Sequence, residues 1–337
     1  MGMEQETEIA AHDPGTEVAG ARGAAVAPAP KPIRVAGDHE VRVGTASWTD
    51  PTMTAAGVFY PPEATSAEDR LRHYASRFPV VEVDASYYAI PSPETARLWV
   101  ERTPAGFIFD VKAHALMTGQ PSEVKRLPKP IRDALPEALA AKARIYGKDL
   151  PGELIDEIWN TFSRAIEPLR EAGRLGAVFL QFPRWVFPSR ESRELILDAR
   201  RRLGVEVAAE FRNASWFNEK NADRTLRFLE ENRVPYVMVD GPQGLRSSIP
   251  PLVAVSSPEL AVIRFHGRRA DLWEKPGIPV VERFRYLYDE DQLADWVPRI
   301  RRVAREARQT HVLMNNCFGN YGTTNAGELA ALLEEQL

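Results

Sequence analysis

The sequence contains a single cysteine, Cys317, among 337 residues. One cysteine cannot form an intrachain disulfide or a cysteine zinc site, and such sparing use fits a reducing cytoplasm. No apolar run is long enough to cross a membrane. There is no His-x-His pair to suggest a compact metal motif. No Gly-x-Gly-x-x-Gly turn follows a predicted strand, which argues against a dinucleotide-binding fold.

Neither sign of charge is in large excess. The chain has 47 acidic and 43 basic residues, a formal net charge of −4. The first 38 residues hold six of the acids and three of the bases, so the rest of the chain has 41 acids and 40 bases. A body this close to neutral lacks the overall basic footprint of a nucleic-acid-binding protein, which leaves only local basic clusters for such a partner.

Residues 1–38 are rich in Ala, Gly, Pro and Glu and contain no apolar run. This composition predicts a disordered tail. The segment also lacks the early basic patch and apolar stretch of a secretory signal, so we expect a cytoplasmic protein without a membrane partner.

Short β-type runs alternate with helical patterns from Val41 onward. The predicted strands are 41–46, 80–84, 107–112, 177–182, 205–211, 235–240, 261–266 and 311–315. The predicted helices lie near 66–77, 93–102, 152–172, 190–203, 222–232, 291–307 and 324–336. Strands separated by helices predict parallel βαβ units. Eight of them predict one α/β domain, residues 39–337, folded as a TIM-type (β/α)8 barrel.

Charged side chains recur at every second position of four predicted strands. Arg264, His266 and Arg268 share one face, while Ile263 and Phe265 share the other. The same alternation groups Glu82 with Asp84, Asp110 with Lys112, and Glu206 with Glu210 and Arg212. Side chains alternate across a sheet, so these charges predict an unusually polar barrel interior. A register shift of one residue would turn all of them outward.

One long segment, about residues 118–151, interrupts the alternation after the third strand. It carries seven basic residues against four acidic ones. Loops after barrel strands lie on the face where barrel active sites occur, so the segment could be a lid. A solvated basic helical insertion is the other interpretation.

Nine short motifs, in order, resemble those of the DUF72, or YecE-like, family. They are Gly44-Thr45-Ala46-Ser47-Trp48, Phe59-Tyr60-Pro61, Val81-Glu82-Val83-Asp84-Ala85-Ser86-Tyr87-Tyr88, Pro91-Ser92-Pro93-Glu94-Thr95, Val111-Lys112-Ala113, Gln181-Phe182-Pro183, Glu210-Phe211-Arg212 followed by Ser215-Trp216-Phe217, Phe265-His266-Gly267-Arg268, and Asn315-Asn316 with Asn325-Ala326. The resemblance runs from about Val41 to the C-terminus. It implies a TIM-type barrel and supplies no activity.

Two positions depart from the pattern of that family. Ser47 stands where the family usually has glycine, and Asp84 where it commonly has asparagine. The second change adds a carboxylate to the barrel mouth, which could strengthen a cation site or alter a neutral hydrogen-bonding role.

Polar residues cluster at the predicted carboxyl ends of the strands, the edge from which barrel enzymes draw catalytic groups. The candidate catalytic residues are Glu210, His266, Lys112 and Asp84. The candidate ligand-binding residues are Arg212, Arg264, Arg268, Trp48, Tyr88, Trp216, Gln181, Asp240, Asn315 and Asn316. Ordinary ion pairs that hold the barrel together are the alternative for these charges.

Three arginine and histidine side chains flank Gly267 after the seventh strand, where barrels frequently bind phosphate. Arg264, His266 and Arg268 therefore predict a small anionic ligand, because guanidinium groups match phosphate bidentately. A structural arginine layer is the alternative. Lys112 could form a Schiff base, although an ion pair is the commoner role.

A divalent metal is the one cofactor that the sequence could support. Its candidate ligands are Glu82, Asp84, Glu210, Asp240 and His266. Without a metal, Glu210 or His266 could act as general acid or base. The aromatic residues Trp48, Tyr87, Tyr88, Trp216 and Phe217 suit stacking on a sugar or nucleobase, or else cap the barrel. Nothing local marks Cys317 as a nucleophile.

Two classes of function remain open. One is an enzyme, a hydrolase, that acts on a phosphorylated or other anionic small molecule or on a nucleic-acid end. The other is a non-catalytic ligand-binding or regulatory barrel. A nucleic-acid partner has only the basic segment 118–151 as local support.

Overall fold

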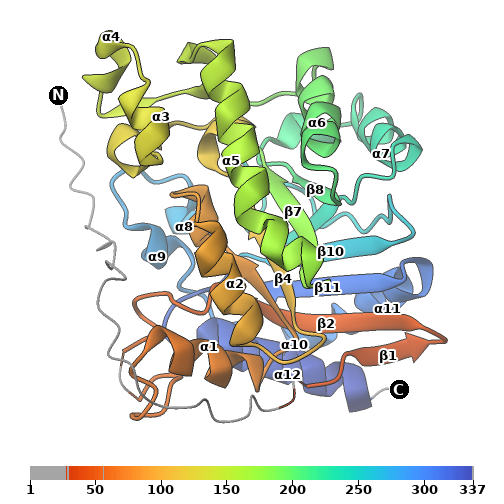
Figure 1. Ribbon diagram of the computed structural model, residues 1–337. Coiled ribbons are helices and arrows are strands. Elements are labelled where there is room, and N and C mark those ends of the chain that lie inside the picture. The colour runs from red at the N-terminus through yellow and green to blue at the C-terminus, as the bar shows by residue number, and fades with distance from the viewer. Residues whose placement is uncertain (1–27, 29, 56, 336–337) are drawn as a thin grey trace.

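The computed structural model describes residues 28, 30–55 and 57–335. Within these residues, eight parallel strands form a nearly closed barrel with helices outside it (Figure 1). The barrel strands are β2 (His39–Ala46), β3 (Val80–Val83), β4 (Ile108–Lys112), β7 (Leu175–Gln181), β8 (Val207–Glu210), β9 (Val237–Asp240), β10 (Leu260–Phe265) and β11 (Gln309–Met314). Their order around the barrel follows the chain, and a single bridge between Ala209 and Tyr236 joins β8 to β9. The predicted barrel is confirmed.

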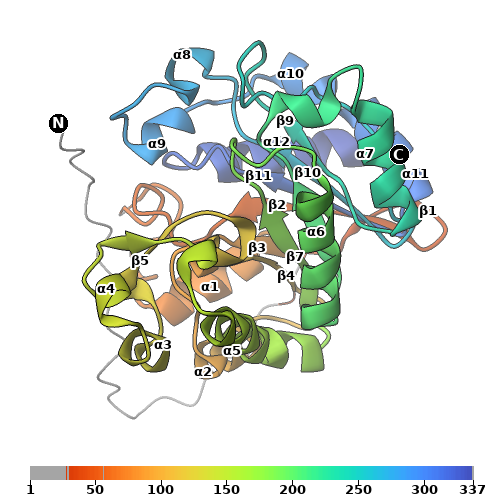
Figure 2. The ribbon, with the colours of Figure 1, turned by 90° about the horizontal axis from the view of Figure 1, so that it is seen from above.

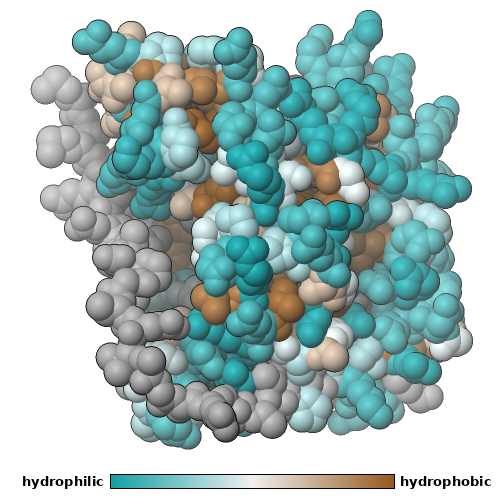
Figure 3. All heavy atoms as spheres, viewed as in Figure 1, coloured by the Kyte–Doolittle hydropathy of each residue, from teal (hydrophilic) through white to brown (hydrophobic). Residues whose placement is uncertain are grey.

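The helices cover the barrel from outside, as the view from above shows (Figure 2). The longer ones are α1 (Ala67–Ala75), α2 (Pro93–Glu101), α5 (Gly152–Glu171), α6 (Arg190–Leu203), α7 (Ala222–Glu231), α11 (Val297–Glu306) and α12 (Tyr321–Glu335). The short ones are α3 (Lys129–Asp133), α4 (Glu137–Ala140), α8 (Ala270–Trp273), α9 (Val280–Arg283) and α10 (Glu290–Ala294). The visible outer face is mainly hydrophilic, with small separate hydrophobic areas (Figure 3). No helix of the described residues is both long and apolar enough to span a membrane.

Local sequence signals explain where several helices begin. Ser66 caps α1 by accepting from the Asp69 amide, and the Asp69 side chain accepts in return from the Ser66 amide. Ser92 caps α2, whose first residue is Pro93. A proline fits there because the first helical N–H has no partner within the helix.

Two sequence predictions about the fold are wrong in detail. Strand β1 (Ile33–Ala36) pairs antiparallel with β2, although it lies inside the predicted tail. Residues 1–27 of that tail lie outside the described residues. The helix predicted over 291–307 is broken between α10 and α11, where Pro298 occupies the first turn of α11. Proline has no amide N–H, so it fits a helix start better than a helix interior.

The segment 118–151 folds as an anchored insertion. Two short strands, β5 (Ser122–Glu123) and β6 (Arg144–Ile145), pair antiparallel beside α3 and α4. Leu127, Ile131 and Ile145 are almost completely buried against the rest of the protein. The insertion and the segment bearing α8 and α9 extend from the same side of the barrel (Figures 1 and 2).

The barrel interior is polar, as the alternation of charges predicts. Arg264 of β10 contacts Glu82 of β3 and Glu210 of β8, and neither strand neighbours β10. Such contacts must cross the lumen. Nearer the amino ends of the strands, His311 Nδ1 lies 2.9 Å from an Asp110 carboxylate oxygen, and both side chains are fully buried.

Candidate functional site

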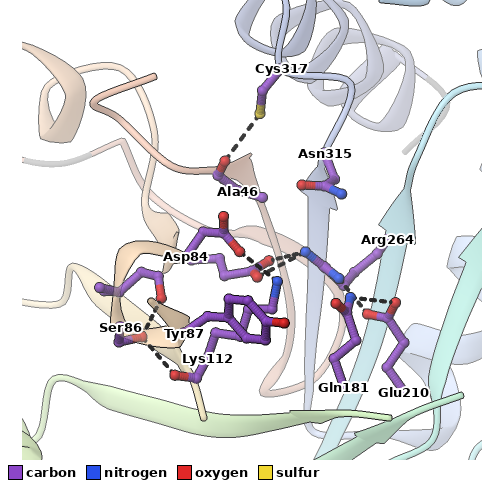
Figure 4. A network of polar contacts seen from close by, with 12 residues as sticks. Ala46, Asp84, Ser86, Tyr87, Lys112, Gln181, Glu210, Arg264, Asn315 and Cys317 are labelled. Atoms are coloured by element: carbon purple, nitrogen blue, oxygen red, sulfur yellow. Dashed lines mark hydrogen bonds and ion pairs between the residues drawn. The ribbon is translucent and has the colours of Figure 1, made fainter. Parts of the chain in front are cut away.

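The centre of the site is a buried arginine between two carboxylates (Figure 4). The Arg264 guanidinium lies 2.7 Å from Glu82 and also donates to Glu210. All three side chains have exposed fractions of 1% or less. Burial alone would lower the pKa of Arg264, but the two carboxylates outweigh it and raise that pKa. Arg264 therefore stays charged and lies below the mouth. This position agrees with a structural arginine layer, the alternative to a phosphate-binding role.

Glu210 is the most heavily hydrogen-bonded carboxylate of the site. Its Oε1 accepts from Arg212 Nε at 2.5 Å and from Gln181 Nε2 at 2.8 Å, while Oε2 accepts from Arg264. Burial would raise the pKa of Glu210, but Arg212 and Arg264 outweigh it and hold the pKa well below its ordinary value. Glu210 is therefore ionised and fixed at neutral pH.

Glu82 shares the same arginine and behaves differently. Burial raises the pKa of Glu82 to about 7, despite the opposing charge of Arg264. Asp84 and Glu210 raise it further, since both are nearby negative charges. The difference from Glu210 has a simple cause, because Glu210 has a second arginine, Arg212, and Glu82 does not.

His266 lies above this centre. Its Nε2 is 3.1 Å from Arg212 Nη2 and its Nδ1 is 2.8 Å from the side-chain amide of Asn315. Burial lowers the pKa of His266, and Arg212 adds to the effect, to about 3. The ring is therefore neutral at pH 7. Because the Asn315 amide nitrogen donates to Nδ1, the neutral ring has its proton on Nε2, which lies 3.3 Å from Glu210 Oε1.

Lys112 and Asp84 form the second ion pair of the mouth. Lys112 Nζ lies 2.8 Å from Asp84 Oδ1 and 4.5 Å from the centre of the Tyr87 ring. Burial would raise the pKa of Asp84, but Lys112 outweighs it and lowers that pKa. The Asp84 side chain is 29% exposed, whereas those of Glu82 and Glu210 are fully buried. Asp84 is thus the carboxylate that a ligand can reach.

A small recess adjoins Arg212 and His266. It has a volume of about 10 Å³, the space of one water, and Trp273 forms part of its wall. The Trp273 ring centre lies 5.3 Å from the Arg212 guanidinium and 6.0 Å from the His266 ring. The segment that carries α8 therefore covers this side of the mouth.

Asp240 and Arg268 lie outside the lumen, although the strand alternation predicts that Arg268 shares the face of Arg264 and His266. Asp240 is aligned with Phe265, whose side chain packs on Tyr288 and Trp296. Its carboxylate accepts from Arg268 at 2.7 and 2.9 Å, from Tyr288 at 2.7 Å and from Trp296 at 2.8 Å. Four donors saturate both oxygens. A metal at Asp240 would have to displace these donors, whereas Arg268 uses only Nε and Nη2 in the network.

Three further predicted ligand-binding residues are packing residues. Trp48 lies edge-on to Trp99 and Phe109, and Trp216 stacks on Phe211 with ring centres 4.1 Å apart. The hydrophobic-cap alternative therefore holds for both tryptophans. Asn316 is completely buried and donates to Tyr286 O and Asn325 Oδ1, so it joins the loop after β11 to the loop at Tyr286 and to α12.

The remaining candidates stay at the mouth. Asn315 and Gln181 contact His266 and Glu210. Tyr88 lies 4.8 Å from Tyr87, and the Arg126 guanidinium of the insertion lies over its ring. The Cys317 thiol donates to Ala46 O, and burial raises its pKa well above the ordinary value, which makes it a poor nucleophile.

The predicted metal site has no compact ligand set. Among the residues described, no group of three or more His, Cys, Asp or Glu lies together as metal ligands do. Glu82, Glu210 and Asp84 already neutralise Arg264, Arg212 and Lys112.

One buried pair was missed by sequence reasoning. His311 and Asp110 lie deeper in the lumen, and a side chain at Gly176 would clash with both. The sequence does contain a signal for this pair, because His311 is an even number of residues from Asn315 and so lies on the same face of the strand.

The match to a family is clear from the chain as a whole. Residues 42–337 match the family described as "Protein of unknown function DUF72". The chain belongs to the DUF72 family. The chain is also similar to the UPF0759 protein YunF of Bacillus subtilis (strain 168), with 28% identity over 298 residues, 87% of this chain and 95% of YunF.

Solved structures of DUF72 proteins share the fold. One from Thermotoga maritima MSB8 has a TM-score of 0.68 and 28% identity, and covers 88% of this chain and 100% of its own. One from Enterococcus faecalis V583 has a TM-score of 0.66 and 26% identity, and covers 88% of this chain and 98% of its own.

Ser47 shows the structural cost of one departure from the DUF72 pattern. Its φ is 101°, in the left-handed region that favours glycine. Its amide donates to Glu82 O at 3.0 Å, so the strained residue joins β2 to β3 just above the buried arginine.

Proposed function

We propose that the chain is a hydrolase that acts on a phosphorylated small molecule, or on the phosphorylated end of a nucleic acid, at the barrel mouth. The observation that carries the proposal is the pair of cations at the mouth, Lys112 and Arg212. Their side chains are 10% and 16% exposed, whereas Arg264 is 1% exposed. Guanidinium and ammonium groups are the side chains that bind phosphoryl oxygens.

Both cations have N–H groups that donate to no described residue. In the described part of the chain Nη1 of Arg212 has no hydrogen-bond partner, since Nε and Nη2 contact Glu210 and His266. The Lys112 ammonium has three N–H bonds and donates one to Asp84. An anion at the mouth would therefore find donors that the described residues do not use.

Asp84 is the reachable carboxylate for the water that attacks phosphorus. Its lowered pKa keeps it ionised, so it can accept the proton of that water. The new P–O bond forms as the ester P–O bond breaks, and the leaving oxygen takes its proton from Lys112. A carboxylate of low pKa is a weak base, so orienting the water is the larger part of its contribution.

A second candidate function is a barrel that binds an anion without turnover. The protonation states of Glu210 and His266 favour it. The pKa of Glu210 is far below neutral, and that of His266 is about 3. Neither group changes protonation near pH 7. This argues against the general acid and base roles that the sequence suggests for them.

Turnover of p-nitrophenyl phosphate and bis(p-nitrophenyl) phosphate, together with calorimetric titration of inorganic phosphate, tests the proposal. We expect Asp84→Asn to lower turnover at least about 100-fold. Phosphate affinity should rise in this variant, because the mouth loses a negative charge. Arg212→Ala should weaken phosphate binding about tenfold or more.

The matched control is Asp156→Asn, which removes an exposed carboxylate of α5 that pairs with Arg202 of α6 on the outside of the barrel. It should leave turnover and phosphate affinity unchanged. Full turnover in Asp84→Asn would refute the assigned role of Asp84. Phosphate binding without turnover of either ester would support the binding barrel instead.

A further inference from the structure

The insertion contains a basic groove separate from the lumen network. The groove has a volume of about 650 Å³, and we call it the insertion groove. It is lined by Glu123, Val124, Lys125, Arg132, Ala140, Lys142, Ala143 and Arg144. Four of the lining residues are cationic and one is acidic. Because the body of the chain is nearly neutral, this excess of positive charge is local.

The single carboxylate of the groove is shared among several cations. Glu123 lies 3.0 Å from Arg126, 3.5 Å from Lys125 and 3.7 Å from Arg144. The Lys125 side chain is 75% exposed, so its charge faces solvent.

The groove is a fixed surface. Its floor is the paired strands β5 and β6, and the buried side chains of Leu127, Ile131 and Ile145 hold the surrounding turns. Gln120, at the start of the insertion, donates to Gln181 O at 3.0 Å and accepts from Tyr87. The insertion is therefore attached directly to the rim of the barrel mouth.

Cations and aromatic rings alternate between the mouth and the groove. Lys112 lies over Tyr87, Tyr87 is in edge contact with Tyr88, and Arg126 lies over Tyr88. Arg126 then pairs with Glu123 in the groove. Bases stack on aromatic side chains and phosphates bind cations, so an alternating row of this kind suits single-stranded nucleic acid.

We propose that the insertion groove and the Tyr87–Tyr88 pair bind a short single-stranded nucleic acid whose phosphorylated end enters the barrel mouth. This inference rests on the proposed function where it places the phosphorylated end in the barrel mouth. It narrows the substrate class of that function to single-stranded nucleic acid. The groove's phosphate contacts are made by Lys125, Arg132, Lys142 and Arg144, and stacking comes from the two tyrosines.

Fluorescence anisotropy of the full chain with a 12-nucleotide oligothymidylate, 5′-phosphorylated and labelled at its 3′ end, tests the inference. Lys125→Ala combined with Lys142→Ala removes two groove charges. We expect binding to weaken at least about tenfold at 50 mM salt. The slope of log K against log salt concentration should become less steep by about 1.4, or 0.7 per lost contact.

The matched control combines Lys129→Ala with Lys148→Ala. It removes two charges from the same insertion, at residues that do not line the groove. Its affinity should stay within about twofold of wild type. Equal weakening in both double variants, or no binding by wild type, would overturn the inference.

Two further measurements identify the ligand class. Tyr88→Ala should weaken single-strand binding about five- to tenfold and leave a 12-base-pair duplex unaffected, because only unpaired bases can stack. A polyglutamate peptide of equal charge should compete poorly. Competition equal to that of the unlabelled oligonucleotide would show an acidic-peptide surface and overturn the nucleic-acid assignment.

The inference and the proposed function can fail separately. Oligonucleotide binding that survives Asp84→Asn, in a protein that hydrolyses neither phosphate ester, would reject the hydrolase and keep the groove assignment. Turnover of a small phosphate ester without oligonucleotide binding would keep the hydrolase and reject the groove assignment.

Discussion

Two polar networks lie near the same edge of the barrel and differ in their surroundings. The lumen network consists of Glu82, Arg264, Glu210, Arg212 and His266. The outer network consists of Asp240, Arg268, Tyr288 and Trp296. Both are built around an arginine and a carboxylate, and both follow strands of the same sheet.

The carboxylate of the outer network is saturated. Both oxygens of Asp240 accept two hydrogen bonds, and the ring of Tyr288 packs between Phe265 and Tyr286. The lumen network extends upward instead to Arg212 and to the recess beside His266. Similar residue types therefore surround a saturated carboxylate outside the barrel and reach a recess at the mouth inside it.

The largest expected effect comes from removing the shared arginine of the lumen. Arg264→Met leaves Glu82 and Glu210 buried without their common cation, and we expect a loss of about 3–5 kcal/mol in the free energy of unfolding. Urea denaturation measures it. The exposed pair of Arg308 and Glu259 is the control, where Arg308→Ala should cost less than about 1 kcal/mol. A similar small loss for Arg264→Met would mean that the lumen pair is not structural.

A smaller loss of stability is expected when the outer network is weakened. Asp240→Asn weakens four hydrogen bonds, two of them to a charged partner, and should cost about 2 kcal/mol of stability. Phosphate affinity, measured by calorimetry, should not change. A decrease of tenfold or more in phosphate affinity would place Asp240 in the ligand site and remove the distinction between the networks.

Glu82 gives the lumen network a pH dependence. Its pKa is raised from 4.5 to about 7, so the folded protein holds this proton at a pH where the unfolded chain has lost it. The stabilising contribution is complete below about pH 4.5 and is lost as the pH rises through about 7. Unfolding measured from pH 5 to 8 should show about 1–3 kcal/mol of decline in wild type relative to Glu82→Gln. Parallel curves would contradict the raised pKa.

The smallest effect concerns the backbone beside the lumen network. Ser47→Gly relieves the φ of 101° but increases the freedom of the unfolded chain and removes the Ser47 hydroxyl that accepts from the Thr49 amide. We expect a net gain of about 0.5–1 kcal/mol by thermal denaturation. Gly319→Ala, at φ 57°, is the opposite control and should be destabilising. A loss in Ser47→Gly would show that the hydroxyl outweighs the strain.

The strand pattern predicts much of the fold. Eight β-type runs, their order and the helices between them follow from local periodicity, which needs only near neighbours in the chain. The tail boundary was misplaced because Ile33–Ala36 becomes a strand only by pairing with β2, and an isolated short run has no such signal.

The candidate site was predicted in part. Lys112, Asp84, Glu210, Arg212 and His266 do meet at one end of the lumen. Trp216 was misassigned because an aromatic next to a polar motif has the same sequence signal whether it stacks on a ligand or on Phe211. The insertion groove could not be derived either, since its lining comes from residues up to 21 positions apart.

Strand periodicity and composition are local properties, so they predict the barrel, its polar interior and the basic insertion. The position of Arg264 between Glu82 and Glu210, and the outward contact of Asp240 with Trp296, depend instead on the folded chain. Those partners are 182, 54 and 56 residues apart. The register between strands sets which side chains meet, and that register is fixed only when the whole barrel closes.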